Sequence, residues 1–208
     1  MDGVFMNKLI KWSAILLAFV CTVTLVDICH DRQVLHDSLI RLHVVGASDA
    51  QIDQNIKLEV RDAVNAWLGV QMAEIDSSEG AREFLRSHLS DLETVANEAL
   101  KLAGSKDQAS ISFMEEAFPT REYDTFSLPA GVYHSLRIRI GEANGRNWWC
   151  VVFPTLCLSA TTAEFRDTAA SAGFDGELSG ALTGETRYEI RFFLLDCLGV
   201  LENFFHMR

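Results

Sequence analysis

An uncharged apolar run near the start of the chain sets the strongest limit on how this protein is built. Residues 12–26 read WSAILLAFVCTVTLV, and Lys8 and Lys11 precede them. A basic flank before a short apolar run is typical of a secretory signal, whereas a membrane span needs about 20 apolar residues. A core helix would carry a polar face, which this run lacks. We therefore expect residues 1–30 to be a signal peptide or a membrane anchor.

The remainder of the chain, residues 31–208, is expected to be one exported domain. Of the 208 residues, 49% are hydrophobic and only three are proline, so the chain can bury a substantial core. The first 30 residues carry no net charge, so the net charge of -11 lies on residues 31–208. This acidity argues against binding to nucleic acids or anionic lipid surfaces, which depends on Lys and Arg. A protein partner or a small molecule remains, and membrane contact is expected through the N-terminal segment.

Hydrophobic periodicity predicts an α+β domain, with several helices packed on a mostly antiparallel sheet. Strand patterns occupy residues 39–45, 109–115, 132–141 and 147–153. Helical patterns occupy residues 52–67, two segments within 77–103 and an apolar closing segment at 191–205, and 159–187 is expected to be surface loop with some helix. Ser48 and Gln51 predict a capping box at the start of the helix at 52–67, and Gly69 is expected to end that helix. Gly104 is expected to end the second of the two helices within 77–103.

The pair Asn144–Gly145 predicts a hairpin between the strands at 132–141 and 147–153. Both residues tolerate the positive φ of a type I′ turn, so the two strands are expected to pair directly. In that register Trp149 lies opposite Ile140 on the core face.

The reverse face of this hairpin is our candidate partner-binding surface. It carries Arg137, Arg139 and Trp148, and the loop from Tyr123 to Pro129 is expected beside it. Arg and Trp dominate the binding energy of many protein interfaces, which favours a partner here. The alternative is that the closing helix covers Trp148.

The cysteines favour neither catalysis nor a metal site. Cys150 and His134 could suggest a thiolate and its base, but the predicted hairpin directs them to opposite faces of the sheet. The spacing of Cys150 and Cys157 matches no zinc knuckle, so we expect no metal and no cofactor. The extended chain between them spans more than a disulfide allows, which favours free buried thiols. A secreted cysteine-dependent hydrolase and a structural envelope protein are two functions that stay open.

Three stretches of the chain resemble the stage II sporulation protein R family. They are IRLHVVGASDAQIDQNIKLEVRDAV (40–64), FPTREYDTFSLPAGVYHSLRIRIGEANGRNWWCVVFPTLC (118–157) and RFFLLDCLGVLENFF (191–205). The middle stretch is the most specific, because FPT-x-x-Y, LPAG-x-Y, the IGE turn and NWWCV-x-FP-x-LC occur in order. Two departures are modest: Gly46–Ala47 stands where the family usually has Ala-Asn, and Thr155 replaces a proline.

The resemblance implies a signalling protein of endospore-forming bacteria. Such a protein would be made in the forespore and exported to the space between the two septal membranes. There it would activate a membrane-embedded aspartic protease of the mother cell, which would then process the precursor of the early mother-cell sigma factor. The resemblance implies no catalysis by the chain itself.

Overall fold

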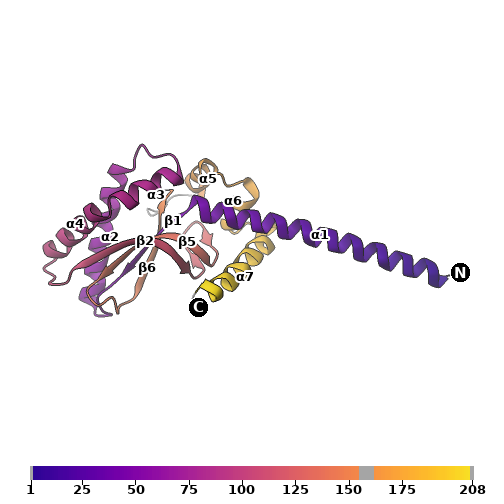
Figure 1. Cartoon of the computed structure of the whole chain (residues 1–208), viewed down its shortest axis with the longest axis horizontal. Helices are drawn as coiled ribbons and strands as arrows, with labels where there is room; N and C mark the ends of the chain where they lie inside the picture. Colours follow the sequence, from indigo (N-terminus) through magenta and orange to yellow (C-terminus); the bar gives the residue numbers. More distant parts are fainter. Residues whose placement is uncertain (1, 155–161, 207–208) are drawn as a thin grey trace.

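A long helix at the N-terminus projects away from the rest of the chain in the computed structural model, which describes residues 2–154 and 162–206 (Figure 1). This helix, α1 (Asp2–Ser38), has 37 residues, and at a rise of 1.5 Å per residue it is about 55 Å long. Residues 6–38 contain an apolar window long enough to cross a membrane, and none of that window is buried. The helix continues past residue 30 without a break, so the N-terminal segment runs directly into the domain.

A four-stranded sheet follows α1, and the first strand lies inside it. Strand β1 (Ile40–Val45) runs parallel to β5 (Gly131–Ile140) and antiparallel to β6 (Asn147–Phe153), while β2 (Ala109–Phe118) is antiparallel to β5. The strand order is β2-β5-β1-β6. All six residues of β1 are buried, as expected for a strand that is paired along both edges. The predicted α+β class with a mostly antiparallel sheet is confirmed.

The predicted hairpin between β5 and β6 is wrong, because β1 lies between these two strands. The connecting loop passes over the end of β1, where the N–H groups of Asn144 and Gly145 donate to the carbonyls of Ala47 and Gly46 at 3.1 and 2.9 Å. A Cβ atom on Gly145 would lie 2.3 Å from the carbonyl oxygen of Ser48. This glycine therefore serves a close approach between two loops rather than a two-residue turn.

Three helices cover one face of the sheet. They are α2 (Gln51–Gln71), α3 (Ser78–Ser87) and α4 (Leu89–Leu102). Alternate strand residues such as Leu42, Val44 and Ile138 form one hydrophobic core with Val60 of α2 and Leu92 of α4. Figure 1 shows α3 and α4 lying along the same side of the sheet.

The helix ends follow the predictions in part. Gly104, with φ of 74°, follows α4 as predicted. Helix α2 runs beyond Gly69, which therefore does not end it. The predicted capping box is also wrong, because Ala50 is the N-cap of α2 and makes no side-chain cap hydrogen bond. Ser48 Oγ instead accepts a hydrogen bond from the backbone N–H of Ala50 at 3.1 Å, within the loop before the helix.

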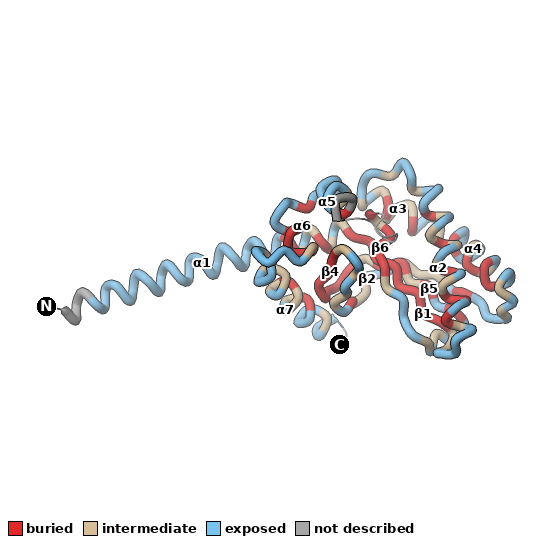
Figure 2. The backbone as a smooth tube through the Cα atoms, turned by 180° about the vertical axis from the view of Figure 1, so that it is seen from behind, coloured by how far each residue is buried: buried red, intermediate tan, exposed pale blue. Residues whose placement is uncertain are grey.

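The C-terminal part of the chain forms a second layer with the last turns of α1. It contains α5 (Thr162–Ser171), α6 (Gly176–Leu182), the short 3-10 helix η1 (Thr186–Tyr188) and α7 (Glu189–His206). A small ribbon of β3 (Arg121–Glu122) and β4 (Ser127–Leu128) joins β2 to β5. The second hydrophobic core combines Ile28 and Leu35 of α1 with Phe118, Tyr133 and Leu195. Figure 2 shows α1 exposed along its projecting part and reaching this layer at its C-terminal end.

The prediction of free thiols is wrong for Cys150, which is disulfide-bonded. Cys157 lies outside the described residues. The prediction treated the chain from 150 to 157 as one extended strand, whereas β6 ends at Phe153. Cys197 is free and exposed, as are Cys21 and Cys29 on α1.

Candidate functional site

The second face of the sheet carries polar residues in rows that cross all four strands. One row is Ser112, Arg137, His43 and Trp149, and the next is Ser110, Arg139, Val45 and Asn147. These two rows lie at the end of β1 that is farther from α1, and we call them, together with Met114, the open sheet face. Ser110, Met114, Arg139 and Asn147 are exposed there, so this end of the sheet is available to a partner.

His43 forms the floor of the open sheet face. The residue is only 3% exposed, and its ring stacks on Trp149 with the ring centroids 3.8 Å apart. Its Nδ1 lies 2.8 Å from a carboxylate oxygen of Glu116, and its Nε2 lies 2.9 Å from the side-chain oxygen of Asn147. His43 therefore ties β2, β1 and β6 together through one side chain.

Glu116 is the acidic group of this network. Ser135 Oγ donates to it at 3.0 Å, and a guanidinium nitrogen of Arg137 lies 3.5 Å away. Burial on its own would raise the pKa of Glu116, but the hydrogen bond and charge of His43, followed by Ser135 and Arg137, hold that pKa below its ordinary value. The carboxylate is thus kept ionised by its neighbours, and it holds Arg137 at the surface.

Arg41 lies one row closer to α1 and is fully buried. Its guanidinium carbon sits 4.2 Å from the ring centroid of Phe118, and its Nη2 donates to the hydroxyl of Tyr123 at 2.7 Å. The nearby Tyr133 is also buried, and burial raises its pKa to about 12. Arg41 therefore anchors the β3–β4 ribbon onto the sheet and is not itself a surface group.

The structure brings only part of the predicted partner-binding set together. Arg137 and Arg139 lie side by side on the open sheet face, as predicted. Trp148 does not join them, because it pairs with Val44 and stacks with Arg61 of α2 on the helix-covered side. The insertion of β1 changes the faces of β6 relative to the predicted hairpin, so Trp149 lies with the arginines instead.

The loop residues of the predicted set lie elsewhere. Pro129 is buried, and its carbonyl accepts a hydrogen bond from the Tyr133 hydroxyl at 2.8 Å. Tyr123 is partly buried and stacks on Phe126. Both residues therefore hold the ribbon in place and do not border the arginines on the open sheet face.

Cys150 and His134 lie apart in the fold, with β1 between their strands. The predicted reason, that they lie on opposite faces of the sheet, was wrong. Their side chains both belong to the helix-covered side, where Cys150 joins the first core. His134 lies on β5 and faces His36 of α1, while Cys150 lies on β6 with β1 in between. The disulfide of Cys150 also removes the thiolate that such a pair would need.

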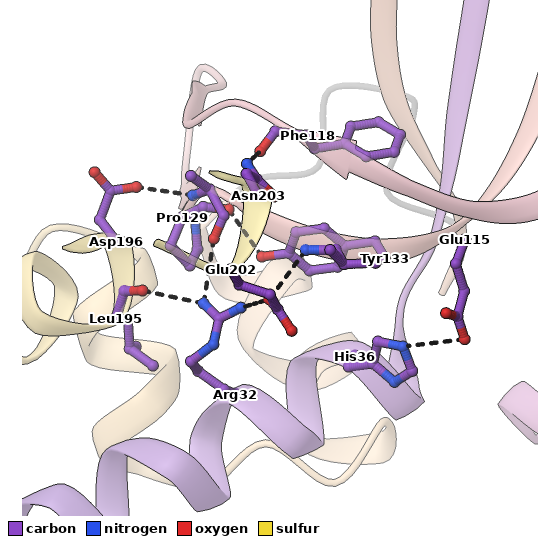
Figure 3. Close-up of polar contacts among 12 residues, drawn as sticks. Arg32, His36, Glu115, Phe118, Pro129, Tyr133, Leu195, Asp196, Glu202 and Asn203 are labelled. Atoms are coloured by element: carbon purple, nitrogen blue, oxygen red, sulfur yellow. Dashed lines mark hydrogen bonds and ion pairs between the residues drawn. The ribbon is translucent and has the colours of Figure 1, made fainter. Parts of the chain in front are cut away.

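A second cluster joins α1, α7 and the segment before β5 (Figure 3). Arg32 of α1 donates to the carbonyls of Ala130 and Leu195 at 3.3 and 3.1 Å and forms an ion pair with Glu202. Asp196 of α7 accepts a hydrogen bond from the N–H of Ala130 at 2.8 Å. We call this cluster the stem junction, because it fixes the end of α1 to the domain.

Sequence reasoning missed His43, Glu116 and Trp149 as members of the site. His43 lies in the first family-like stretch and Trp149 in the second, whereas Glu116 lies in neither. Their contact depends on the antiparallel pairing of β1 with β6, which joins residues more than 100 positions apart. The sequence motifs contain His43 and Trp149, but nothing in the sequence shows that the strands carrying these residues pair with each other.

Comparisons with known proteins cover the region that builds this site. The family model described as stage II sporulation protein R matches residues 36–163. The curated stage II sporulation protein R of Bacillus subtilis (strain 168) is 39% identical over 124 residues, which cover 60% of this chain and 55% of that protein. The chain thus spans about half the length of this curated relative, and no solved structure matches. The family match includes every strand of the sheet, and the chain belongs to the stage II sporulation protein R family.

Proposed function

We propose that this chain is an exported signalling protein of sporulation that activates a membrane-embedded aspartic protease of the mother cell. The protease would then process the precursor of the early mother-cell sigma factor. Membership of the family supports the role in sporulation. The apolar helix α1 supports a position at a membrane, either as an anchor or as a signal segment.

The placement of the open sheet face carries this proposal. Strand β1 starts two residues after α1, and its six residues extend the chain by about 20 Å at 3.3 Å per residue. Arg139 and Asn147 flank Val45, the last residue of β1, so they lie at the end of the sheet away from α1. Figure 1 shows α1 leaving the domain on the opposite side from this end. A protein in a facing membrane would meet the open sheet face first.

The charge of this face supports an acidic partner. The chain has a net charge of -11, yet Arg137 and Arg139 are neighbours in one surface patch. Glu116 forms an ion pair with Arg137 at 3.5 Å, and the exposed Arg139 lies next to that pair. Arginine beside an aromatic ring is common in binding hot spots, and its guanidinium suits carboxylates. We therefore expect an acidic segment on the extracytoplasmic side of the protease to bind here.

The two alternative functions make different predictions. A cysteine-dependent hydrolase needs a thiolate, and the bonded sulfur of Cys150 supplies none in this fold. A structural envelope protein would not alter the activity of any protease. The distinction between signalling and structure therefore rests on a measured effect on cleavage.

Coexpression in a host that does not form spores tests the proposal. The protease and the sigma factor precursor are produced with or without this chain, and precursor cleavage is followed by immunoblotting. We expect cleavage only when the chain is present, and none when a catalytic aspartate of the protease is replaced. Equal cleavage with and without the chain would contradict the proposal and favour the structural role.

A further inference from the structure

We propose that His36, Glu115 and His134 form a zinc site that fastens the end of α1 to the edge of the sheet. Each residue offers one ligand atom, and these atoms lie within 4.8 Å of one another. His36 Nε2 is 3.7 Å from a carboxylate oxygen of Glu115, and the ring centroids of His36 and His134 are 4.6 Å apart. Zinc bonds of about 2.1 Å in a tetrahedron place ligand atoms about 3.4 Å apart, which small side-chain rotations reach here.

The backbone brings these three side chains together from distant parts of the chain. Glu115 and His134 are directly opposite each other in the β2–β5 pair. His134 is also the partner of Ile40, the first residue of β1, and α1 ends two residues before that strand. The last turn of α1 therefore lies beside the start of β5, and Figure 3 shows His36 pointing toward Glu115.

A neighbouring carboxylate orients His36 as a metal ligand. Asp37 lies 3.0 Å from His36 Nδ1, and its other oxygen accepts a hydrogen bond from Gln33 at 2.7 Å. A carboxylate on one imidazole nitrogen leaves the other nitrogen free for a metal, and this arrangement is common around zinc. Phe113 lies nearly parallel to the ring of His134, with the ring centroids 6.1 Å apart.

The ligand set and its surroundings favour zinc. Two imidazoles and one carboxylate suit Zn²⁺, whereas Ca²⁺ and Mg²⁺ prefer ligand sets made of oxygen. A surface cavity of about 420 Å³ borders His36 and Glu115, and Glu202 and His206 of α7 line its other side. Water or a side chain from α7 can therefore occupy the fourth position of a tetrahedron.

Two arginines of α3, Arg82 and Arg86, lie near His134, and both contact other groups. Arg82 of α3 donates to the carbonyl of Asp37 at 2.7 Å and to the carboxylate of Glu79 at 2.6 Å. Its guanidinium is therefore directed at other acceptors. A bound zinc ion would join α1, β2 and β5 next to the stem junction, and it would resist separation of α1 from the domain.

Zinc binding by the full-length chain in detergent micelles tests this proposal. The protein is stripped with a chelator, and Zn²⁺ is titrated in competition with a chromophoric chelator. We expect one tightly bound Zn²⁺ per chain and a rise in the thermal unfolding temperature when Zn²⁺ is added. With Co²⁺ in place of Zn²⁺, the intense visible absorption of a tetrahedral site is expected.

Matched variants distinguish this site from incidental binding. Glu115→Gln keeps the shape of an exposed side chain. Glu115→Gln and His36→Ala, each made singly, should abolish tight binding of Zn²⁺. Asp37→Asn should weaken binding by about 10- to 100-fold, because it removes the carboxylate that orients His36. His30→Ala on the exposed part of α1 is the control and should bind as the unaltered chain does.

Circular dichroism is used to check that each variant is folded. If His36→Ala does not fold, the binding measured with Glu115→Gln decides the result. Binding of Zn²⁺ that is unchanged in the folded Glu115→Gln variant would overturn the proposal. So would a Co²⁺ spectrum without tetrahedral bands, or a loss of binding in His30→Ala of the same size as in His36→Ala.

Discussion

His43, Glu116 and Trp149 hold the floor of the open sheet face, and one carboxylate carries most of the polar contacts. Glu116 is bound by His43 and Ser135 and faces Arg137. Replacing one partner of a buried, charged hydrogen-bond network costs about 1–3 kcal/mol. We expect Glu116→Gln to lower the free energy of unfolding at neutral pH by that amount, measured by chemical denaturation.

The pH dependence of this effect follows from the lowered pKa of Glu116. The ordinary value is 4.5, and the folded-state pKa lies below it. A carboxyl with a depressed folded pKa stabilises the protein fully above pH 4.5 and loses that contribution as pH falls through the folded pKa. The difference between the unaltered chain and Glu116→Gln should therefore shrink below pH 4.5. A difference that grows on acidification would contradict this assignment, and the exposed Glu98→Gln serves as the control.

Individual site residues were predicted only where their strand kept its predicted faces. Arg137 and Arg139 lie on β5, whose alternation is visible in the sequence, and their placement was correct. On β6 the prediction exchanged Trp148 and Trp149, because a strand has a period of two and every side chain changes face with a one-residue shift. The identity of the pairing partner, β1, could not be obtained from the residues of β6.

Helix α7 packs closely against the segment before β5, and a glycine makes this possible. A Cβ atom on Gly199 would lie 1.6 Å from the carbonyl oxygen of Ala130, which must shift to accept it. We expect Gly199→Ala to lower the free energy of unfolding by about 1–3 kcal/mol or more, as overpacking does elsewhere. Chemical denaturation of the full chain in micelles measures this change.

Gly69→Ala on α2 is the matched control for that substitution. No atom lies within 4 Å of the Cβ position of Gly69, and alanine is favoured over glycine inside a helix by about 0.5–1 kcal/mol. This variant should therefore be slightly more stable than the unaltered chain. Equal effects of Gly69→Ala and Gly199→Ala would show that α7 does not pack as described.

The elements themselves were largely predictable, whereas their order in the sheet was not. Strands β1, β2, β5 and β6 and helices α2, α3, α4 and α7 lie close to the predicted ranges, since each has a strong local period. The parallel pairing of β1 with β5 joins residue 40 to residue 134 and leaves no local mark. Asn144–Gly145 favoured a direct hairpin, but the hydrogen bonds of that loop to Gly46 and Ala47 show what it does instead.

At the scale of the whole molecule, α1 is both a membrane-length helix and a part of the core. Leu35 is only 1% exposed, and Asp31 forms a buried ion pair with Arg191 of α7 at 2.7 Å. We expect Leu35→Ala in the full chain to destabilise the domain by about 2–5 kcal/mol. Leu16→Ala on the exposed part of the same helix should leave domain unfolding unchanged. Equal unfolding curves for both variants would mean that the C-terminal end of α1 is not part of the folded domain.

The sequence predicted the apolar segment and the α+β domain, but it did not predict that the end of α1 packs into the domain. Hydropathy falls after residue 26, which suggested a boundary near residue 30. Arg32 at the end of α1 contacts Ala130, Leu195 and Glu202, which lie about 100 to 170 positions later in the sequence. No local pattern reports such packing, so the stem junction became visible only in the fold.

The proposed function requires this chain to bind the protease through the open sheet face. Arg139 is the exposed arginine of that face, and Arg187 on η1 is an exposed arginine on another surface. The direct measurement is precursor cleavage in the coexpression system with Arg139→Glu and, as control, Arg187→Glu, both checked for folding. We predict that Arg139→Glu reduces cleavage by about 30-fold or more, because a binding hot spot is worth about 2 kcal/mol, while Arg187→Glu does not. Unchanged cleavage with a folded Arg139→Glu chain would show that the open sheet face does not bind the protease.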